Sequence, residues 1–368
     1  MASTWHDLGG ADSFRLRPLT GVTVGSTRLL VTHKGGQFGV LSAVCSHAGG
    51  PLEKGRLDGD YVVCPWHAWT FERQAGHCKP PWDHETTPAY AVKVESGRLL
   101  VDLDSKTKRV VDPQTHPLKR KPVRAPGPLR VVGISTTVMN KEAPRFSTSE
   151  ALLEESLRHA ATKGAETKMI RLNDLSIRPC EGYYSIAAPA CTWPCTITQK
   201  DPKDQMAEVY EALVHWADVV LVATPIRWGA ASSLYFRMAE RLNTVQNQMT
   251  THSNVLIRNK VAAFIVTGGQ DNVQAVAGQM MNFFAELGFH FPQFPFIGHS
   301  RGWSAEDMER NVAYVQQSDE LRQGARSLAE RALELAHTLV EHQHPGATVE
   351  SGGRKASGLV EQAPRGAT

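Results

Sequence analysis

Hydrophobic and polar residues alternate in short segments through the first part of the chain. Segments such as GVTVGST, QFGVLSAV and AYAVKVE are separated by glycine, aspartate and proline turn signals, and helical periodicity is nearly absent. Alternation with a period of two is typical of half-buried strands in an antiparallel sheet. We therefore expect residues 1–103 to form a small antiparallel all-β domain.

The pattern changes at residue 129. Runs that are apolar throughout, such as VVLVATP and VAAFIVTG, alternate with segments whose apolar residues recur every three to four positions. Strands that are buried on both faces and separated by helices are typical of a parallel sheet covered on both sides. We expect a doubly wound α/β domain over 129–343, with helices over 147–163, 206–216, 234–245 and 318–341 and one through Met280 and Phe284.

The stretch 104–128 is basic and rich in proline, which predicts a solvated, extended linker, and 344–368 has a composition typical of disorder. No stretch approaches the roughly 18 to 20 consecutive apolar residues that cross a bilayer, and the first residues lack the features of an export signal. The formal net charge of +3 comes from nearly balanced totals. We expect a cytoplasmic two-domain protein without a membrane or nucleic-acid partner.

Two cysteine–histidine pairs lie in the predicted β domain, with sixteen residues between them. Cys45 and His47 form the first pair, and Cys64 and His67 form the second. Two thiolates suit one iron and two neutral imidazoles suit another, so each loop supplies one ligand to each metal of a 2Fe-2S cluster. Zinc is the structural alternative, but a zinc finger pairs cysteine with cysteine and histidine with histidine.

The stretch CSHAGGPLEKGRLDGDYVVCPWHAWTFE resembles the Rieske domains of ferredoxins and ring-hydroxylating dioxygenases. The resemblance implies that Cys45 and Cys64 bind a buried iron, and that His47 and His67 bind an exposed one. The loops lack the extra cysteines that form a disulfide in respiratory Rieske proteins, which favours the ferredoxin-like branch. We interpret Cys78 as a packed or surface thiol, with a fifth-ligand or redox role as the alternative. No D-x2-H-x3-4-H segment for a mononuclear iron follows, so we do not expect oxygenase activity within the chain.

Three loops of the α/β domain leave the carboxyl ends of predicted strands, the edge at which doubly wound sheets bind ligands. Ser147 and Glu150 predict a capping box, so the first loop leads into a helix N-terminus that can hold a phosphate. No G-x-G-x-x-G or P-loop motif is present. The candidate cofactor-binding residues are Ser135, Arg145, Ser147, Thr148 and Ser149 in the first loop, Pro225, Ile226, Arg227, Trp228 and Gly229 in the second, and Gly268 and Gly269 in the third.

The segments VVGIST, PRFSTSEALL, ADVVLVATPIRWGAASSLYFRMAERL and FIVTGGQDN resemble the NADPH-dependent FMN reductase family of the flavodoxin-like superfamily. The resemblance implies a flavodoxin-like fold, bound FMN, NAD(P)H as electron donor, and association into a homo-oligomer through the flavin edge. The first loop is longer than the family's short form, so which of its residues touch the phosphate stays open. The sequence does not choose between NADH and NADPH.

The segment RPCEGYYSIAAPACTWPC is similar to the cysteine-rich insertion of iron-sulfur flavoproteins, which binds a second cluster. Those proteins use four closely spaced cysteines, whereas only Cys180, Cys191 and Cys195 are present here. We expect buried or degenerate cysteines. A second cluster with a fourth ligand from elsewhere is the alternative.

A flavin accepts two electrons as hydride and releases them one at a time, so a flavin domain joined to a Rieske domain makes a short redox chain. We expect an oxidoreductase that passes electrons from NAD(P)H through FMN to a Rieske 2Fe-2S cluster and on to an acceptor protein or small molecule. No catalytic acid or base is assigned, because the cofactors carry the chemistry. Two alternatives stay open: an NAD(P)H:quinone or nitroaromatic reductase with the Rieske domain as accessory electron port, and a non-enzymatic redox sensor.

Overall fold

The computed structural model describes residues 5–80, 85–111, 116–268, 272–300 and 304–342. The chain divides into two compact units, one made of Met1–Thr115 and Gly182–Thr192 and the other of His116–Glu181 and Trp193–Thr368. This division differs from the predicted boundaries in two places. The first unit extends past residue 103, and it includes a segment from the middle of the predicted α/β domain. The predicted tail lies outside the described residues.

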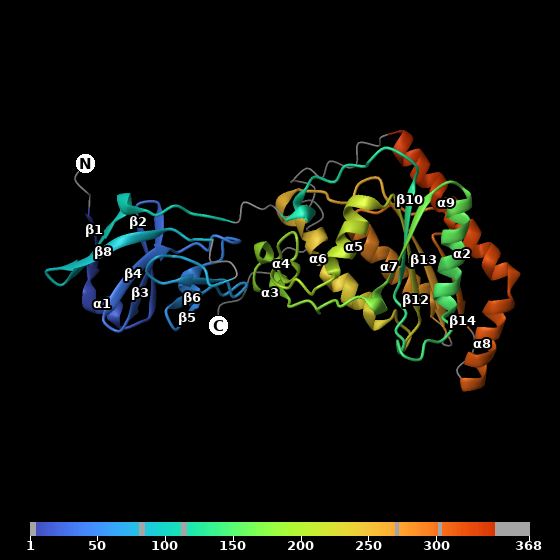
Figure 1. Ribbon diagram of the computed structural model, residues 1–368, viewed down its shortest axis with the longest axis horizontal. Coiled ribbons are helices and arrows are strands. Elements are labelled where there is room, and N and C mark those ends of the chain that lie inside the picture. Colours follow the sequence, from blue (N-terminus) through green and yellow to red (C-terminus); the bar gives the residue numbers. More distant parts are fainter. Residues whose placement is uncertain (1–4, 81–84, 112–115, 269–271, 301–303, 343–368) are drawn as a thin grey trace, which may run out of the picture. The chain divides into compact units, whose positions relative to one another are not determined.

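The described part of the first unit contains two antiparallel sheets, with strand orders β1-β9-β8-β4-β3-β2 and β5-β6-β7 (Figure 1). Alternating side chains of both sheets, among them Leu30, Leu41 and Phe71, form one core together with Cys45 and Cys64. The predicted antiparallel all-β fold is confirmed. The strands are β1(Trp5–Gly10), β2(Leu19–Val24), β3(Thr27–Lys34), β4(Gln37–Ser42), β5(Arg56–Asp58), β6(Tyr61–Val63), β7(Thr70–Glu72), β8(Ala89–Glu95) and β9(Arg98–Asp102), and the helical elements are α1(Ala11–Arg15), η1(Leu52–Lys54), η2(Leu103–Ser105), α3(Tyr183–Ile186) and η5(Ala188–Ala190).

Parts of the predicted linker make long-range contacts, although most of its described residues are exposed. In the first unit, the backbone N–H of Thr86 donates to the carbonyl of Val110 at 2.8 Å. In the second unit, Leu118 is buried, and its carbonyl accepts hydrogen bonds from Trp193 Nε1 and His215 Nε2, each at 3.1 Å. The expectation of a solvated, extended connector is therefore wrong for Val110 and Leu118. Their backbone carbonyls accept hydrogen bonds from residues far away in the sequence, whereas the basic, proline-rich composition predicted that such groups would bind water.

The second unit contains a parallel sheet with strand order β11-β10-β12-β13-β14, which confirms the predicted doubly wound, flavodoxin-like fold (Figure 1). Helices α2, α8 and α9 lie on one side of the sheet, and α5, α6 and α7 lie on the other. The strands are β10(Arg130–Ser135), β11(Glu166–Arg171), β12(Val219–Pro225), β13(Val261–Gly268) and β14(Phe296–Ser300). The helical elements are η3(Pro117–Lys119), α2(Thr148–Thr162), η4(Leu172–Asp174), α4(Thr196–Lys200), α5(Met206–Tyr210), the π-helix η6(Glu211–Trp216), α6(Ser233–His252), α7(Val273–Leu287), α8(Ala305–Gln317) and α9(Asp319–Glu341).

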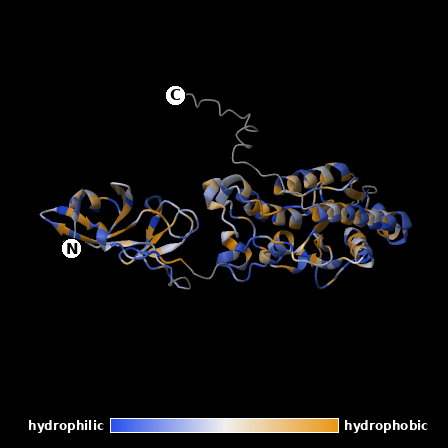
Figure 2. Cartoon of the chain, turned by 90° about the horizontal axis from the view of Figure 1, so that it is seen from above, coloured by the Kyte–Doolittle hydropathy of each residue, from blue (hydrophilic) through white to orange (hydrophobic). Residues whose placement is uncertain are grey.

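The sheet of the second unit is apolar on both faces, as its sequence predicts. Val131, Leu221 and Ile265 pack against α2 and α9 in one buried cluster, and the helices carry hydrophilic residues on their outer faces (Figure 2). Strand order reverses between β10 and β12, so the loops that follow these two strands flank the position at which such sheets bind ligands. Within the described residues, no helix combines the length and apolarity that a bilayer crossing requires.

Candidate functional site

Two loops of the first unit bring the four predicted cluster ligands together. Cys45 and His47 follow β4, and Cys64 and His67 lie between β6 and β7. The ring centroids of the two histidines are 4.8 Å apart, and a hydrogen bond joins the two thiols. The Nδ1 atoms of both histidines are buried. The sequence motif therefore becomes one compact set of two sulfur and two nitrogen donors.

Backbone hydrogen bonds and two glycines give these loops their shape. The N–H of Cys45 donates to the carbonyl of Gly50 at 2.8 Å, and the N–H of Gly49 donates back to Cys45 at 2.9 Å. Gly49 has a φ of +82°, which L-residues rarely adopt. A Cβ atom at Gly50 would lie 2.7 Å from Sγ of Cys64. The first loop can therefore approach the second this closely only with glycine at position 50.

The donor set fits a Rieske-type cluster. The hydrogen bond with the Cys64 thiol, together with burial, holds the pKa of the Cys45 thiol far above its ordinary value. Two adjacent buried thiols resist ionisation unless a cation compensates the charge, and bound iron would provide this compensation. Among the described residues, no group of three or more His, Cys, Asp or Glu side chains is placed to hold a single metal ion. A Rieske cluster requires only two protein ligands at each iron.

Aromatic and acidic groups surround the predicted ligands. The indole of Trp69 stacks on the His47 ring, with centroids 4.1 Å apart, and its Nε1 donates to the Glu85 carboxylate at 2.9 Å. Cys78 is buried in the same core, where burial and the Glu85 charge raise the pKa of its thiol to about 12. Cys78 is thus a packed thiol with little thiolate character at neutral pH.

The second predicted histidine ligand, His67, is covered by the segment Gly182–Thr192. His67 is 1% exposed, and its Nε2 lies 2.6 Å from the carbonyl oxygen of Ala190. Because a carbonyl oxygen only accepts, Nε2 carries the proton and Nδ1 keeps its lone pair for a metal. The ring of Tyr183 meets the His67 ring edge-on, with centroids 4.7 Å apart. No local pattern in the sequence indicates this contact, since more than a hundred residues separate its partners.

A cavity of about 610 Å³ opens at the carboxyl edge of the parallel sheet in the second unit. This volume is within the range of cofactor pockets, which is about 300–1,000 Å³. All three predicted loops contribute to its wall. The predicted residues that line it are Arg145, Ser147, Thr148, Pro225, Ile226, Arg227, Trp228 and Gly268.

The other predicted residues are placed differently. Ser135 is buried behind the wall and donates to the Glu150 carboxylate at 2.5 Å. Ser149 is also buried, with its hydroxyl 3.3 Å from that of Thr137. Gly229 supports the second loop through its carbonyl, which accepts a hydrogen bond from Asn272 Nδ2 at 2.6 Å. Gly269 lies outside the described residues.

Hydroxyl groups gather at the N-terminus of α2. Thr137 and Ser147 are joined through their Oγ atoms at 2.8 Å, and Thr148 reaches Oγ1 of Thr267 on β13 at 2.6 Å. Ser147 caps the helix, because its Oγ accepts the N–H of Glu150 at 3.3 Å. The predicted capping box is only half formed, since the Glu150 carboxylate is used by Ser135 and Arg171 instead. A hydroxyl-lined helix N-terminus of this kind fits a phosphate.

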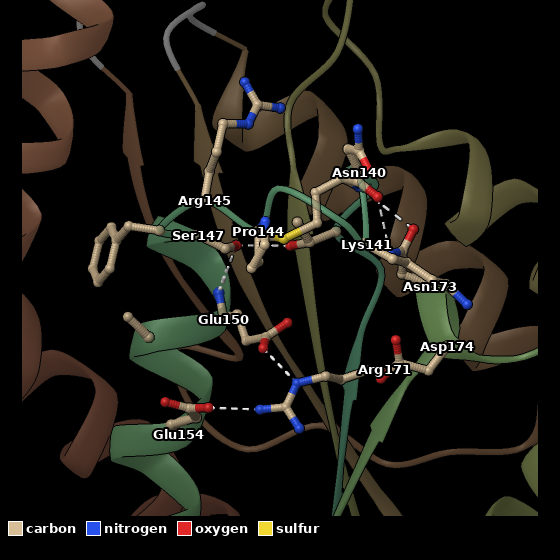
Figure 3. A pocket seen from close by; sticks show the side chains of 14 residues that line it. Asn140, Lys141, Pro144, Arg145, Ser147, Glu150, Glu154, Arg171, Asn173 and Asp174 are labelled. Atoms are coloured by element: carbon tan, nitrogen blue, oxygen red, sulfur yellow. Dashed lines mark hydrogen bonds and ion pairs between the residues drawn. The ribbon is translucent and has the colours of Figure 1, made fainter.

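A smaller cavity of about 380 Å³ shares the first loop with the larger one (Figure 3). Arg171 on its floor donates to Glu150 at 2.6 Å and to Glu154 at 2.8 Å. Figure 3 shows Arg145 on the opposite side of the loop, pointing away from these carboxylates. The guanidinium of Arg171 is thus neutralised by α2, whereas Arg145 lines both cavities without entering that network.

The second loop presents an aromatic side chain at the tip of a tight turn. The N–H of Arg227 donates to Ala230 at 2.7 Å, and the N–H of Ala230 donates back at 3.0 Å. Trp228 at the tip has a φ of +50° and is 94% exposed. Beside it, a Cβ at Gly268 would lie 2.8 Å from Cβ of Ile226. Glycine at position 268 therefore lets the second and third loops pack closely at this part of the pocket wall.

Helix α8 supplies part of the wall that the sequence did not predict. Asn311 is 4% exposed, and its Nδ2 donates to the carbonyl of Gly268 at 3.2 Å. A capping box between Ser304 and Asp307 begins α8, and this S-x-x-D signal was present in the sequence. The wall residues that were missed are Thr137, Val138, Met139, Phe146, Thr267, Glu309, Asn311 and Val312.

Comparisons with known proteins agree with one cofactor site in each unit. Residues 4–91 match the Rieske 2Fe-2S domain family, and residues 130–301 match the family described as NADPH-dependent FMN reductase. The oxygenase component of 3-ketosteroid-9-alpha-monooxygenase from Mycolicibacterium smegmatis is 39% identical over 107 residues, which cover 27% of this chain and 28% of that protein.

The second unit has relatives of its own. The 8-demethyl-8-aminoriboflavin-5'-phosphate synthase of Streptomyces davaonensis is 24% identical over 164 residues, which cover 45% of this chain and 60% of that protein. The chain thus spans less than two thirds of the length of either of these curated relatives. The solved structure of RosB with the bound intermediate 8-demethyl-8-formylriboflavin-5'-phosphate matches with a TM-score of 0.48 and 18% identity, covering 65% of this chain and 90% of that chain. One chain carries a Rieske 2Fe-2S domain and an NADPH-dependent FMN reductase domain, which together imply a 2Fe-2S cluster, FMN and NAD(P)H.

Proposed function

We propose that this oxidoreductase carries electrons from NAD(P)H through FMN to its Rieske cluster and on to an acceptor protein or small molecule. The proposal is supported chiefly by one observation: a single chain holds both the two-loop Cys/His site and a pocket at the switch point of a flavodoxin-like sheet. Nicotinamide gives up electrons in pairs and a 2Fe-2S cluster takes them singly. FMN supplies the conversion between the two.

The residues of the second unit would bind and orient the flavin. The hydroxyls of Ser147 and Thr148 lie at the N-terminus of α2, where the helix dipole favours an anion, and Arg145 adds a positive charge. We assign the FMN phosphate to this end of the pocket. Ile226 and Trp228 of the second loop would contact the ring and exclude water from it.

In the first unit, Cys45, His47, Cys64 and His67 would hold the cluster. Imidazole ligands leave a 2Fe-2S cluster less negative than an all-cysteine set does, which raises its potential and suits it to accept electrons from a reduced flavin. The protein's part is to keep the four donors in place and to limit water around them, which the buried core of Leu30, Phe71 and their neighbours accomplishes.

Anaerobic stopped-flow mixing of the full chain with NADPH, and separately with NADH, tests the proposal. We expect the flavin absorbance to bleach first and the cluster absorbance to bleach afterwards, with the reduced cluster confirmed by electron paramagnetic resonance. The Cys64→Ser variant is the control, because it should lose the second phase and keep the first. Flavin reduction without later cluster reduction in the wild type would overturn internal transfer.

Turnover of the same variant separates the alternatives. If the protein is a quinone or nitroaromatic reductase with an accessory Rieske port, Cys64→Ser retains acceptor turnover. If it is a redox sensor, neither protein consumes NAD(P)H steadily when acceptors are added.

A second candidate function follows from the similarity to a synthase of a modified flavin phosphate. In this alternative the bound flavin is the substrate rather than a permanent carrier. Mass spectrometry of the flavin recovered after many turnovers decides between the two, since a carrier is recovered as unchanged FMN.

A further inference from the structure

The middle of the cysteine-rich insertion noted in the sequence folds as part of the cluster-binding unit, whereas Cys180 and Cys195 at its ends belong to the second unit. Gly182–Thr192 belongs to the first unit, although the residues on either side of it belong to the second. Within this segment, Tyr183 packs edge-on against His67, and the carbonyl of Ala190 accepts from Nε2 of the same ring. The insertion therefore meets a cluster ligand directly.

Internal hydrogen bonds hold the segment in a defined shape. The N–H of Ser185 donates to Gly182 at 2.9 Å, and the N–H of Ala190 donates to Ala187 at 2.8 Å. The short helices α3 and η5 result, and they leave the Ala190 carbonyl directed at His67. This acceptor is positioned by the fold itself, as expected for a contact that orients a metal ligand.

The two histidine ligands consequently differ in their surroundings. His67 is 1% exposed and lies under the segment, whereas His47 is only partly buried and stacks on Trp69. A hydrogen-bonded path through Ala190 and His67 leads from the segment to the cluster site without an intervening gap. An external protein cannot reach Nε2 of His67 while the segment is in place.

We propose that Gly182–Thr192 is the contact through which electrons enter the cluster, on its His67 side, and that the His47 side meets the acceptor. The inference rests on the proposed function for the identity of the donor, a reduced flavin. One electron enters by His67 for each electron that leaves by His47, and no bond is formed or broken. Tyr183 is a positioning residue, because it fixes the plane of the His67 ring.

Chemical modification of the cluster-loaded full chain tests the covering of His67 without any flavin chemistry. Diethyl pyrocarbonate acylates accessible imidazole nitrogens, and peptide mass spectrometry assigns the modified residue. We expect modification of His47 but protection of His67 in the wild type. Tyr183→Ala should make His67 react several-fold faster, while Tyr184→Ala is the matched control, because Tyr184 is the neighbouring tyrosine and is 50% exposed. Equal reactivity of His67 in all three proteins overturns the inference.

The rate of cluster reduction tests the entry route. In Tyr183→Ala, we expect reduction of the cluster by NADPH to slow several-fold while reduction of the flavin keeps its rate. Tyr183→Phe retains the ring and should restore the wild-type rate, which distinguishes positioning of His67 from general damage to the fold. Unchanged NADPH-driven cluster reduction in Tyr183→Ala overturns the entry role. If NADPH reduces no flavin even in the wild type, the proposed function fails, and the modification experiment still decides whether the segment covers His67.

Discussion

Replacing Asp204 with alanine should destabilise the second unit strongly. Asp204 and Arg241 form a buried ion pair in which both side chains are 0% exposed. The pair is bidentate, with Nη1–Oδ1 and Nη2–Oδ2 distances of 3.0 and 2.7 Å. Arg241 also donates to Thr198 and to the carbonyl of Arg178. Arg241 on α6 therefore links Arg178 and Thr198, which lie before and after the segment Gly182–Thr192 in the sequence.

Removing one partner leaves the other charge buried without compensation, which typically costs about 3–5 kcal/mol. We expect the double variant Asp204→Ala/Arg241→Met to recover part of this loss, because it removes both charges. Glu208→Ala is the control. Its ion pair with Lys168 is exposed, with 40% and 41% side-chain exposure, and exposed pairs contribute at most about 1 kcal/mol.

Urea unfolding followed by far-ultraviolet circular dichroism measures these differences, since the long helices of the described residues belong to the second unit. With an m-value of roughly 2–3 kcal/mol/M, the Asp204→Ala midpoint should fall on the order of 1–2 M. A shift as small as that of Glu208→Ala, or a double variant no more stable than the single one, would refute the reasoning.

Acid should weaken the same pair. Burial by itself would raise the pKa of Asp204, but hydrogen bonds from Arg241 and the Arg178 N–H outweigh it and hold the pKa below its ordinary value of 3.8. The stabilisation is therefore complete above that value and is lost as pH falls through the lower pKa of the folded state. Asp204→Ala should abolish this part of the acid sensitivity.

Four further outcomes are expected. Cys64→Ser should lose the iron and visible absorbance of the cluster while Cys78→Ser keeps both, and retention of the cluster in Cys64→Ser would remove that residue from the ligand set. Gly50→Ala should abolish cluster assembly, measured as iron per chain, because its Cβ would lie 2.7 Å from Sγ of Cys64. Burial lowers the pKa of Lys260 to about 8, so the unfolded chain binds more protons between about pH 8 and 10.5. The urea midpoint of the wild type should therefore rise as the pH increases from about 8 to 10.5, and that of Lys260→Met should not. If the midpoints of both proteins change with pH in the same way, the lowered pKa is contradicted. Asn311→Ala should release FMN several-fold more readily on dilution, detected by flavin fluorescence, and unchanged retention would argue against a role for α8 in the pocket.

Local patterns were sufficient to predict the antiparallel sheet of the first unit, the parallel sheet of the second and the grouping of the predicted cluster ligands, but not the short strands β1, β5 and β7. Cys45 and His47 are two residues apart, and Cys64 and His67 three, so each pair needs only one short loop to converge. The apolar strands required a sheet buried on both faces, and a parallel sheet with helices on both sides is the arrangement that provides it.

The features that were missed depend on contacts between distant residues. The composition of the linker does not reveal that the carbonyl of Leu118 accepts hydrogen bonds from the side chains of Trp193 and His215. In the same way, nothing around Ala190 shows that its carbonyl will meet an imidazole 123 positions earlier. Helix α8 has a polar sequence that gives no sign of a place in the pocket wall. Its side-chain amide at Asn311 reaches the pocket by donating to the carbonyl of Gly268, which is distant in the sequence.

The segment Gly182–Thr192 makes the two halves of this chain inseparable by simple truncation. A fragment that ends at the linker would contain all four predicted cluster ligands but would lack the cover over His67, which is encoded far downstream. The complementary fragment would carry an uncovered aromatic loop, with Tyr183 facing solvent instead of an imidazole. We therefore expect recombination that exchanges one Rieske domain for another to require a matching Gly182–Thr192 segment as well.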